Sequence, residues 1–141
     1  MRTTSVPDLA GQLRLTIVRT ARRLRQEAGT DLSPSLTAAL STVERHGPMT
    51  PSELAARERI QRPTATRVLA RLEEQGLIER TPDPRDGRSS LVTATTAGRE
   101  LLAALRTRKT AFLASRIETL SADERATLER AADILERMLA E

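Results

Sequence analysis

The sequence predicts a mainly helical protein with one small β-hairpin, and three observations support this fold class. Leu, Ala, Val and Ile recur at three- and four-residue spacing near both ends of the chain, which is typical of amphipathic helices. A capping Ser or Thr followed by Pro marks two helix starts in the first half. Residues 77–95 instead contain two short β-leaning runs joined by a segment rich in Pro, Asp and Arg.

The first two predicted helices occupy the N-terminal third of the chain. One covers residues 8–28 and ends at Gly29. The next begins at Ser33, an N-cap followed by Pro34, and runs to about Arg45. The apolar stripe of the first helix consists of Leu9, Leu13, Ile17, Ala21, Leu24 and Ala28.

Two further helices follow at short distance. The sequence TPSE at residues 50–53 is a capping box, so a short helix begins there and continues to about residue 58. The pair RP at residues 62–63 opens another helix, which runs to residue 74 and is closed by Gly76.

The hairpin is predicted from residues 77–80 and 91–95, with the loop TPDPRDGRSS at residues 81–90 between them. This loop is longer than the two-residue turn of a plain hairpin. Its two prolines restrict the backbone, and Gly87 is expected to supply a turn position with positive φ. The loop would then hold Arg85 and Arg88 at the end of a stiff β-ribbon.

Two helices are predicted after the hairpin. Thr95 and Thr96 can cap a long helix over residues 97–120, and residues 121–124 form a second capping box. The last helix then has Leu128, Ala131, Leu135 and Met138 on one face.

Two helices joined by a tight turn and followed by a hairpin form a winged helix-turn-helix. We assign residues 33–96 to this DNA-binding region, and residues 1–32 and 97–141 to a helical dimerisation region of the same continuous domain. The terminal apolar stripes need to be buried, and in so small a chain a second copy is the expected partner. The candidate dimerisation residues are Leu9, Leu13, Ile17, Leu128, Leu135 and Met138.

The helix at residues 62–74 has the faces that a recognition helix needs. Ala65, Val68, Leu69 and Leu72 share one side, whereas Thr64, Arg67 and Arg71 lie roughly 135° away, at about 100° per residue. Arginine pairs with guanine O6 and N7, and threonine contacts a base or a thymine methyl group. The same pattern also fits an ordinary helix whose polar face is exposed to solvent. The hairpin likewise fits an ordinary surface hairpin exposed to solvent.

The loop arginines suit a narrow minor groove, whose negative potential attracts arginine. Asp83 and Asp86 are interpreted as residues that cap the turn and orient these arginines. The candidate DNA-contacting residues are Arg62, Thr64, Thr66, Arg67, Arg71, Arg85 and Arg88.

Composition sets limits on the class of protein. The net charge is +4, and it comes almost entirely from arginine, either through codon bias or through selection for phosphate and base contacts. Cysteine is absent, which excludes disulfides and thiolate metal sites. We expect a cytoplasmic protein, because neither a membrane span of about 20 apolar residues nor a signal-peptide pattern is found. The arginines of residues 19–25 could meet flanking phosphates, line an anionic ligand site or remain solvated.

Nearly the whole chain resembles the MarR-type transcriptional regulators, and the resemblance is most specific over residues 49–101. The runs TRVLARLEEQGLIER and DPRDGR are similar to the recognition-helix and wing signature of that family, and TTAGREL resembles the start of its long dimerisation helix. The resemblance implies a homodimer on a pseudo-palindromic operator. It places Thr66, Arg67 and Arg71 in the major groove and Arg88 in the wing.

Many members of this family release DNA on binding a small phenolic or other lipophilic anion, so a small lipophilic or anionic effector is an expected partner. This sequence departs from common sensing schemes. It has no cysteine for a thiol sensor, a single histidine for zinc, and almost no aromatic residues to stack on a phenol. No metal or cofactor is expected.

Three alternative functions can be compared with the sequence. An enzyme is disfavoured, because no glycine-rich phosphate loop or nucleophile motif is found and His46 fits a helix end. A winged-helix module that binds protein would lack groove-compatible arginines. A DNA-binding regulator without any ligand also fits the sequence.

Overall fold

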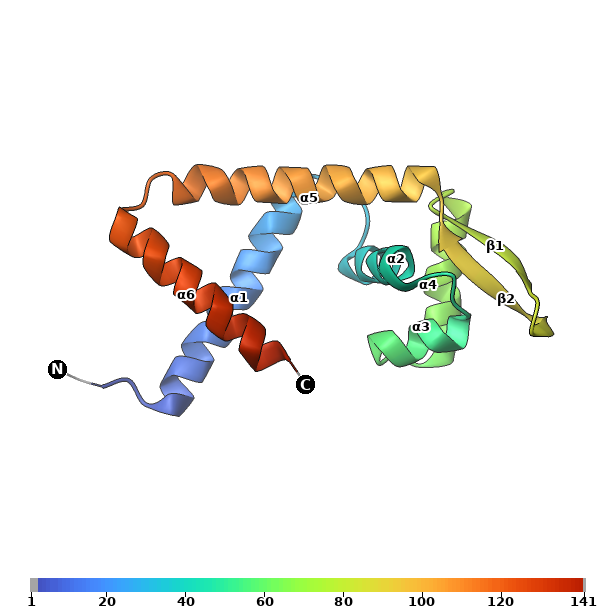
Figure 1. Ribbon diagram of the computed structural model, residues 1–141, viewed down its shortest axis with the longest axis horizontal. Coiled ribbons are helices and arrows are strands. Elements are labelled where there is room, and N and C mark those ends of the chain that lie inside the picture. Colours follow the sequence, from blue (N-terminus) through green and yellow to red (C-terminus); the bar gives the residue numbers. More distant parts are fainter. Residues whose placement is uncertain (1–2, 141) are drawn as a thin grey trace. The chain divides into compact units, whose positions relative to one another are not determined.

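The computed structural model describes residues 3–140 and confirms the predicted fold class. The described residues form a helical chain with one two-stranded antiparallel sheet, whose strands are β1 and β2. The elements, drawn in Figure 1, are α1 Val6–Ala28, α2 Pro34–His46, α3 Pro51–Glu58, α4 Arg62–Glu74, β1 Ile78–Asp83, β2 Asp86–Ala94, α5 Thr96–Ile117 and α6 Ala122–Leu139.

The predicted caps fix where these helices begin. The Ser33 hydroxyl accepts a hydrogen bond from the Leu36 backbone N–H, 3.2 Å away, at the start of α2. Capping boxes join Thr50 to Glu53 before α3 and Ser121 to Glu124 before α6. In each case a side chain satisfies backbone donors that have no partner within the helix.

The chain divides into two compact units. One contains residues 28–107, and the other contains residues 3–27 together with residues 108–140. Helix α5 contributes its first half to one unit and its second half to the other. None of the helices in the described part of the chain is long and apolar enough to cross a membrane.

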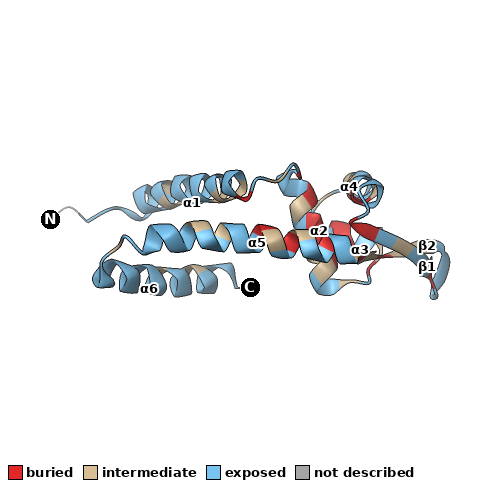
Figure 2. Cartoon of the chain, turned by 90° about the horizontal axis from the view of Figure 1, so that it is seen from above, coloured by how far each residue is buried: buried red, intermediate tan, exposed pale blue. Residues whose placement is uncertain are grey.

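Every buried residue of the described chain lies in the unit of residues 28–107. Figure 2 shows these buried positions on α2, α3, α4, the start of the hairpin and the first half of α5. The largest fully buried side chains are Leu40, Val43, Met49, Leu54, Leu69, Leu72, Val92 and Leu105. Each buried Leu contributes about 1.5–3 kcal/mol through the apolar surface it removes from water. An isolated bridge between Met49 and Val92 ties the segment before α3 to β2.

The other unit has no buried residue among residues 3–27 and 108–140. Its helices expose large apolar side chains on both α1 and α6, and the same unit holds all of the strongly exposed ones in the described chain. They are Val6, Leu9, Leu15, Ile17, Val18, Leu113, Ile117, Leu128, Ile134, Met138 and Leu139.

The hairpin corrects the sequence prediction. The strands run from Ile78 to Asp83 and from Asp86 to Ala94, so only residues 84–85 form the turn. The prediction of a ten-residue loop over residues 81–90 was therefore wrong. The register shifts between Pro82 and Asp83, because Pro82 pairs with Ser90 whereas Asp83 pairs with Asp86. The residues left over form a bulge in β2. Gly87 lies in β2 and is not among the residues with positive φ, contrary to prediction.

Candidate nucleic-acid interface

The turn between α3 and α4 is only three residues long. Arg59 adopts a left-handed backbone (φ 54°, ψ 44°) and caps α3, where its N–H donates to the carbonyls of Ala55 and Ala56. Ile60 then packs against the core. This geometry fixes the angle at which α4 leaves α3, as in other helix-turn-helix units.

Helix α4 has the two faces that its sequence predicts. Ala65, Leu69 and Leu72 are fully buried, while Val68 is half-buried against the core. The buried side attaches α4 to its unit and leaves the opposite side for a ligand.

The outward side of α4 carries the predicted polar residues. Arg67 and Arg71 are exposed and Thr64 is half-buried. An Arg67 Nη2 lies 3.5 Å from the Thr64 hydroxyl, which links the two side chains one turn apart. The Thr66 hydroxyl donates its hydrogen to the Arg62 carbonyl at 3.1 Å. The methyl group and the oxygen lone pairs of Thr66 remain available for contacts outside the helix. Arg62 is exposed.

A hollow of about 330 Å³ lies between α4 and the start of α2. The sequence predicted Ser33 only as a cap and did not predict this hollow. The hollow brings Ser33 and Ser35 beside Arg67 and Arg71, next to the N-terminus of α2. Hydroxyl groups, arginines and a helix N-terminus are all groups that contact phosphate. The sequence signal was the Ser-Pro-Ser start of α2. Lining residues are Ser33, Ser35, Leu36, Thr64, Arg67, Val68 and Arg71.

Asp83 organises the turn of the hairpin. Its side chain is only 4% exposed, and its Oδ1 accepts from the Arg85 backbone N–H at 2.9 Å. This backbone hydrogen bond lowers the pKa of Asp83, with the Arg85 guanidinium adding to the effect against the opposing influence of burial. The predicted capping role of Asp83 is confirmed by these contacts.

Arg85 is held by two carboxylates. Its Nε lies 3.4 Å from Asp83 Oδ1, and its Nη2 lies 3.6 Å from Glu53 Oε1 on α3. The hydrogen bond to Asp83, followed by the charges of Asp83 and Glu53, raises the pKa of Arg85. The arginine therefore ties the turn to α3 while 71% of its side chain stays exposed.

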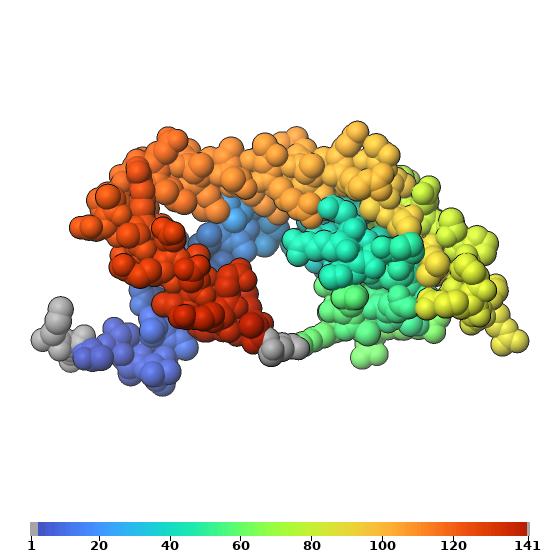
Figure 3. All heavy atoms as spheres, in the orientation of Figure 1, coloured from blue at the N-terminus to red at the C-terminus, as the bar shows by residue number. Residues whose placement is uncertain are grey.

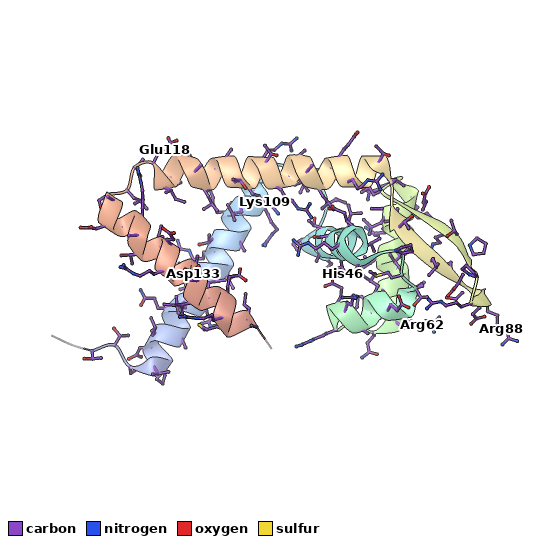
Figure 4. The ribbon with its side chains drawn as sticks, in the orientation of Figure 1. His46, Arg62, Arg88, Lys109, Glu118 and Asp133 are labelled. Atoms are coloured by element: carbon purple, nitrogen blue, oxygen red, sulfur yellow. The ribbon has the colours of Figure 1, made fainter. Side chains whose placement is uncertain are left out.

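Arg88 lies in the bulge of β2 and is exposed. Its backbone N–H donates to Asp86 Oδ1 at 3.0 Å, which confirms Asp86 as a cap. In the described part of the chain its guanidinium forms no ion pair. Figure 4 shows Arg88 at the outer end of the hairpin and Arg62 beside α3 and α4. In the space-filling view of Figure 3 the hairpin end projects beyond the atoms of those helices.

The candidate dimerisation residues lie in the other unit. Leu9, Ile17, Leu128 and Met138 are exposed, and Met138 has 66% of its surface accessible. Leu13 and Leu135 are half-buried.

No group of three His, Cys, Asp or Glu side chains is placed to hold a metal ion within residues 3–140. His46 is the last residue of α2, next to the C-cap Gly47, as the sequence indicated.

Comparison with known proteins decides the family. The model of the MarR family matches residues 32–90. An HTH-type transcriptional regulator of Mycobacterium leprae is 40% identical over 134 residues, which cover 94% of each chain. This chain belongs to the MarR family. MarR regulators bind DNA through a helix-turn-helix and are not enzymes, so the chain is a DNA-binding transcriptional regulator.

Solved structures agree with the MarR fold. A crystal structure of a transcriptional regulator protein from Pseudomonas aeruginosa is 35% identical, with a TM-score of 0.88 over 99% of this chain and 100% of that one. The multiple antibiotic resistance repressor MarR is 28% identical, with a TM-score of 0.75 over 94% of this chain and 95% of that one.

Proposed function

We propose that this MarR-family regulator is a homodimeric repressor that binds a pseudo-palindromic operator and is released by a small lipophilic or anionic effector. One observation carries the proposal, namely the division of the chain into a unit with a complete core and a unit without one. The first unit presents the DNA-facing arginines, and the second presents apolar side chains that require a partner.

The dimer is proposed from the uncovered helices. Residues 1–32 and 97–141 supply the dimerisation region, and residues 33–96 supply the DNA-binding region. Support comes from the exposed leucines, isoleucines and methionines of α1 and α6, because monomeric proteins rarely leave so many large apolar side chains in water. A second copy of the same chain covers them by a two-fold contact.

The docking geometry is proposed from the faces of α4 and from the hairpin. Arg67 and Arg71, with Thr64 and Thr66, contact base edges in the major groove, while Arg62 begins the same helix. Arg88 enters the adjacent minor groove, and Arg85 contacts the backbone from the turn. Ser33 and Ser35 add phosphate contacts beside α4, which set its register without reading sequence.

The repressor role is supported by the similarity to a solved repressor of the same family. A dimer that occupies a site overlapping a promoter excludes the transcription machinery. This activity takes place in the cytoplasm.

Selection of genomic fragments by the purified protein, followed by footprinting at two salt concentrations, tests the proposal. We expect a protected site with two-fold symmetry near a promoter and binding that weakens steeply as salt rises. Uniform weak binding to all fragments would instead favour a protein-interaction module. Operator binding that persists through a broad panel of anionic and aromatic compounds would favour a regulator without a ligand.

A further inference from the structure

A cavity of about 610 Å³ lies between α1 and the second half of α5, within the unit of residues 3–27 and 108–140; it is open to solvent, and all its lining residues except the half-buried Phe112 are exposed. Cavities of roughly 300–1,000 Å³ are the size that holds small molecules. Figure 1 shows the C-terminal half of α1 running up to α5. The residues that line the cavity are Thr16, Arg19, Thr20, Arg22, Arg23, Gln26, Phe112 and Arg116.

The lining carries four arginines and no carboxylate. Arg19, Arg22 and Arg23 repeat at three- and four-residue spacing on one face of α1, and like charges at this spacing repel each other along a helix. Only Arg23 has an acidic partner, Glu27, at 2.9 Å. Within residues 3–140, no carboxylate forms an ion pair with the other three arginines.

Phe112, the single aromatic residue of the chain, holds two of these arginines in place. The guanidinium carbons of Arg23 and Arg116 lie 5.3 and 5.1 Å from the centre of its ring. Both distances are in the range of cation–π contacts. The ring therefore orients two planar guanidinium groups at the cavity before any ligand arrives, which lowers the cost of binding.

The chemistry of the lining indicates the class of ligand. Guanidinium groups pair with carboxylates and phosphates through two parallel hydrogen bonds. Thr16, Thr20 and Gln26 add neutral polar groups, although the Thr20 hydroxyl hydrogen is already donated to the Thr16 carbonyl at 2.7 Å. Because two arginines already occupy Phe112, the ring offers little room for stacking a phenolic ligand. Arg19, Arg22 and Arg116 have no acidic partner among the described residues, and three such charges around one cavity favour a ligand with more than one negative group.

We propose that the α1–α5 cavity binds a small molecule carrying two or more carboxylate or phosphate groups. This ligand would act as the effector of the proposed function. Only the effect of the ligand on DNA binding rests on that function. Binding itself is measured on the full-length protein without DNA, so the two can fail separately.

Calorimetric titration of the full-length protein with pyrophosphate, citrate and benzoate tests the site. We expect pyrophosphate or citrate to bind at least tenfold more tightly than the monoanion benzoate. The variants Arg19→Gln and Arg116→Gln should each weaken that binding at least tenfold. Arg14→Gln removes the same charge from an exposed position of α1 outside the lining, and it should change the affinity less than twofold.

Conservative variants keep the test informative if a glutamine variant unfolds. Arg19→Lys retains the charge but loses the planar fork, and it should weaken binding several-fold while circular dichroism stays unchanged. Phe112→Leu should weaken binding several-fold by freeing Arg23 and Arg116.

Two results would overturn the site. One is the absence of binding by pyrophosphate and citrate at millimolar concentration, and the other is a loss of affinity in Arg14→Gln equal to that in Arg19→Gln and Arg116→Gln. If pyrophosphate or citrate binds but leaves the operator complex intact, the site stands and the effector step of the proposed function fails.

Discussion

Gly98 packs so closely against the carbonyl oxygen of Leu77 that a β-carbon at this position would lie 2.2 Å from that oxygen. Three residues earlier, the Thr95 hydroxyl donates to the Gly76 carbonyl at 2.6 Å and accepts from the Gly98 backbone N–H at 3.1 Å. Together Thr95 and Gly98 fix the start of α5 against the chain that enters β1. This contact is the physical reason for a Thr and a Gly three residues apart in the segment TTAGREL.

Gly98→Ala should therefore destabilise the fold. The new methyl group meets backbone and not a movable side chain, so we expect a loss of about 1–3 kcal/mol in the free energy of unfolding. Urea unfolding measures this loss. The control is Gly11→Ala within α1, where no atom lies within 4 Å of an added β-carbon and a gain of about 0.5–1 kcal/mol is expected. Equal stability of the two variants would contradict the assigned contact.

Arg67→Ala and Arg71→Ala should relax base preference in the operator. Each should cost about 1–3 kcal/mol of specific binding if the arginine forms two hydrogen bonds to a base. Arg67→Lys is the matched control, because it keeps the charge and should retain nonspecific affinity while losing specificity. Binding to the operator and to a scrambled duplex separates these effects. Unchanged operator affinity in both alanine variants would refute the docking geometry.

Arg88→Ala should weaken binding to operators with AT-rich flanks and leave the fold intact. The side chain is exposed and forms no ion pair among the described residues, so its removal disturbs no internal contact. Affinities for operators with AT-rich and GC-rich flanks provide the measurement, and unfolding in urea provides the control. A uniform loss for both operators would indicate a phosphate contact instead of a minor-groove contact.

The hairpin turn should weaken on acidification. A carboxyl group whose pKa is lowered in the folded state stabilises the fold above its unfolded pKa, about 3.9, and loses that contribution as the pH falls through the folded pKa. Asp83 is such a group. The difference in urea midpoint between the wild type and Asp83→Asn should be constant from neutral pH to about pH 5, and it should shrink below about pH 4. A difference independent of pH would show that the Asp83 charge does not stabilise the turn.

Leu135→Lys should prevent dimerisation, because it places a charge within the apolar stripe of α6. Sedimentation velocity should show a shift from dimer to monomer. Asp133→Lys introduces the same side chain on the opposite face of α6, by the helical period of about 100° per residue, and should leave the dimer intact. A dimer that tolerates Leu135→Lys would place the interface elsewhere.

Local signals predicted most of the fold. Ser33, Thr50 and Ser121 cap helices as their sequence context indicates, because a cap is decided within three or four residues. The periodic apolar positions of α4 likewise became its buried face. The hairpin was mispredicted because Pro82 and Gly87 were both assigned to a loop, whereas each lies in a strand. In a two-stranded ribbon each strand has a free edge, so a residue without a backbone N–H is tolerated there.

Contacts between distant residues could not be predicted from the sequence. Glu53 reaches Arg85 from another element, so local patterns give no sign of the ion pair. The same holds for the cavity that gathers Arg23, Phe112 and Arg116 from two helices. The sequence identified the arginines of residues 19–25 as candidates for an anionic ligand site, and only the fold placed Arg23 and Arg116 around one ring.

If the proposed dimer covers these helices, the lack of buried residues in the unit of residues 3–27 and 108–140 makes the stability of that unit depend on protein concentration. Helices without a core of their own gain it only by association, and mass action then links folding to the number of copies present. Dilution should lower the melting temperature of this unit while leaving that of residues 28–107 unchanged. A cell with few copies would therefore hold subunits whose association helices are unfolded and open to proteolysis, which sets a lower limit on the abundance at which the regulator works.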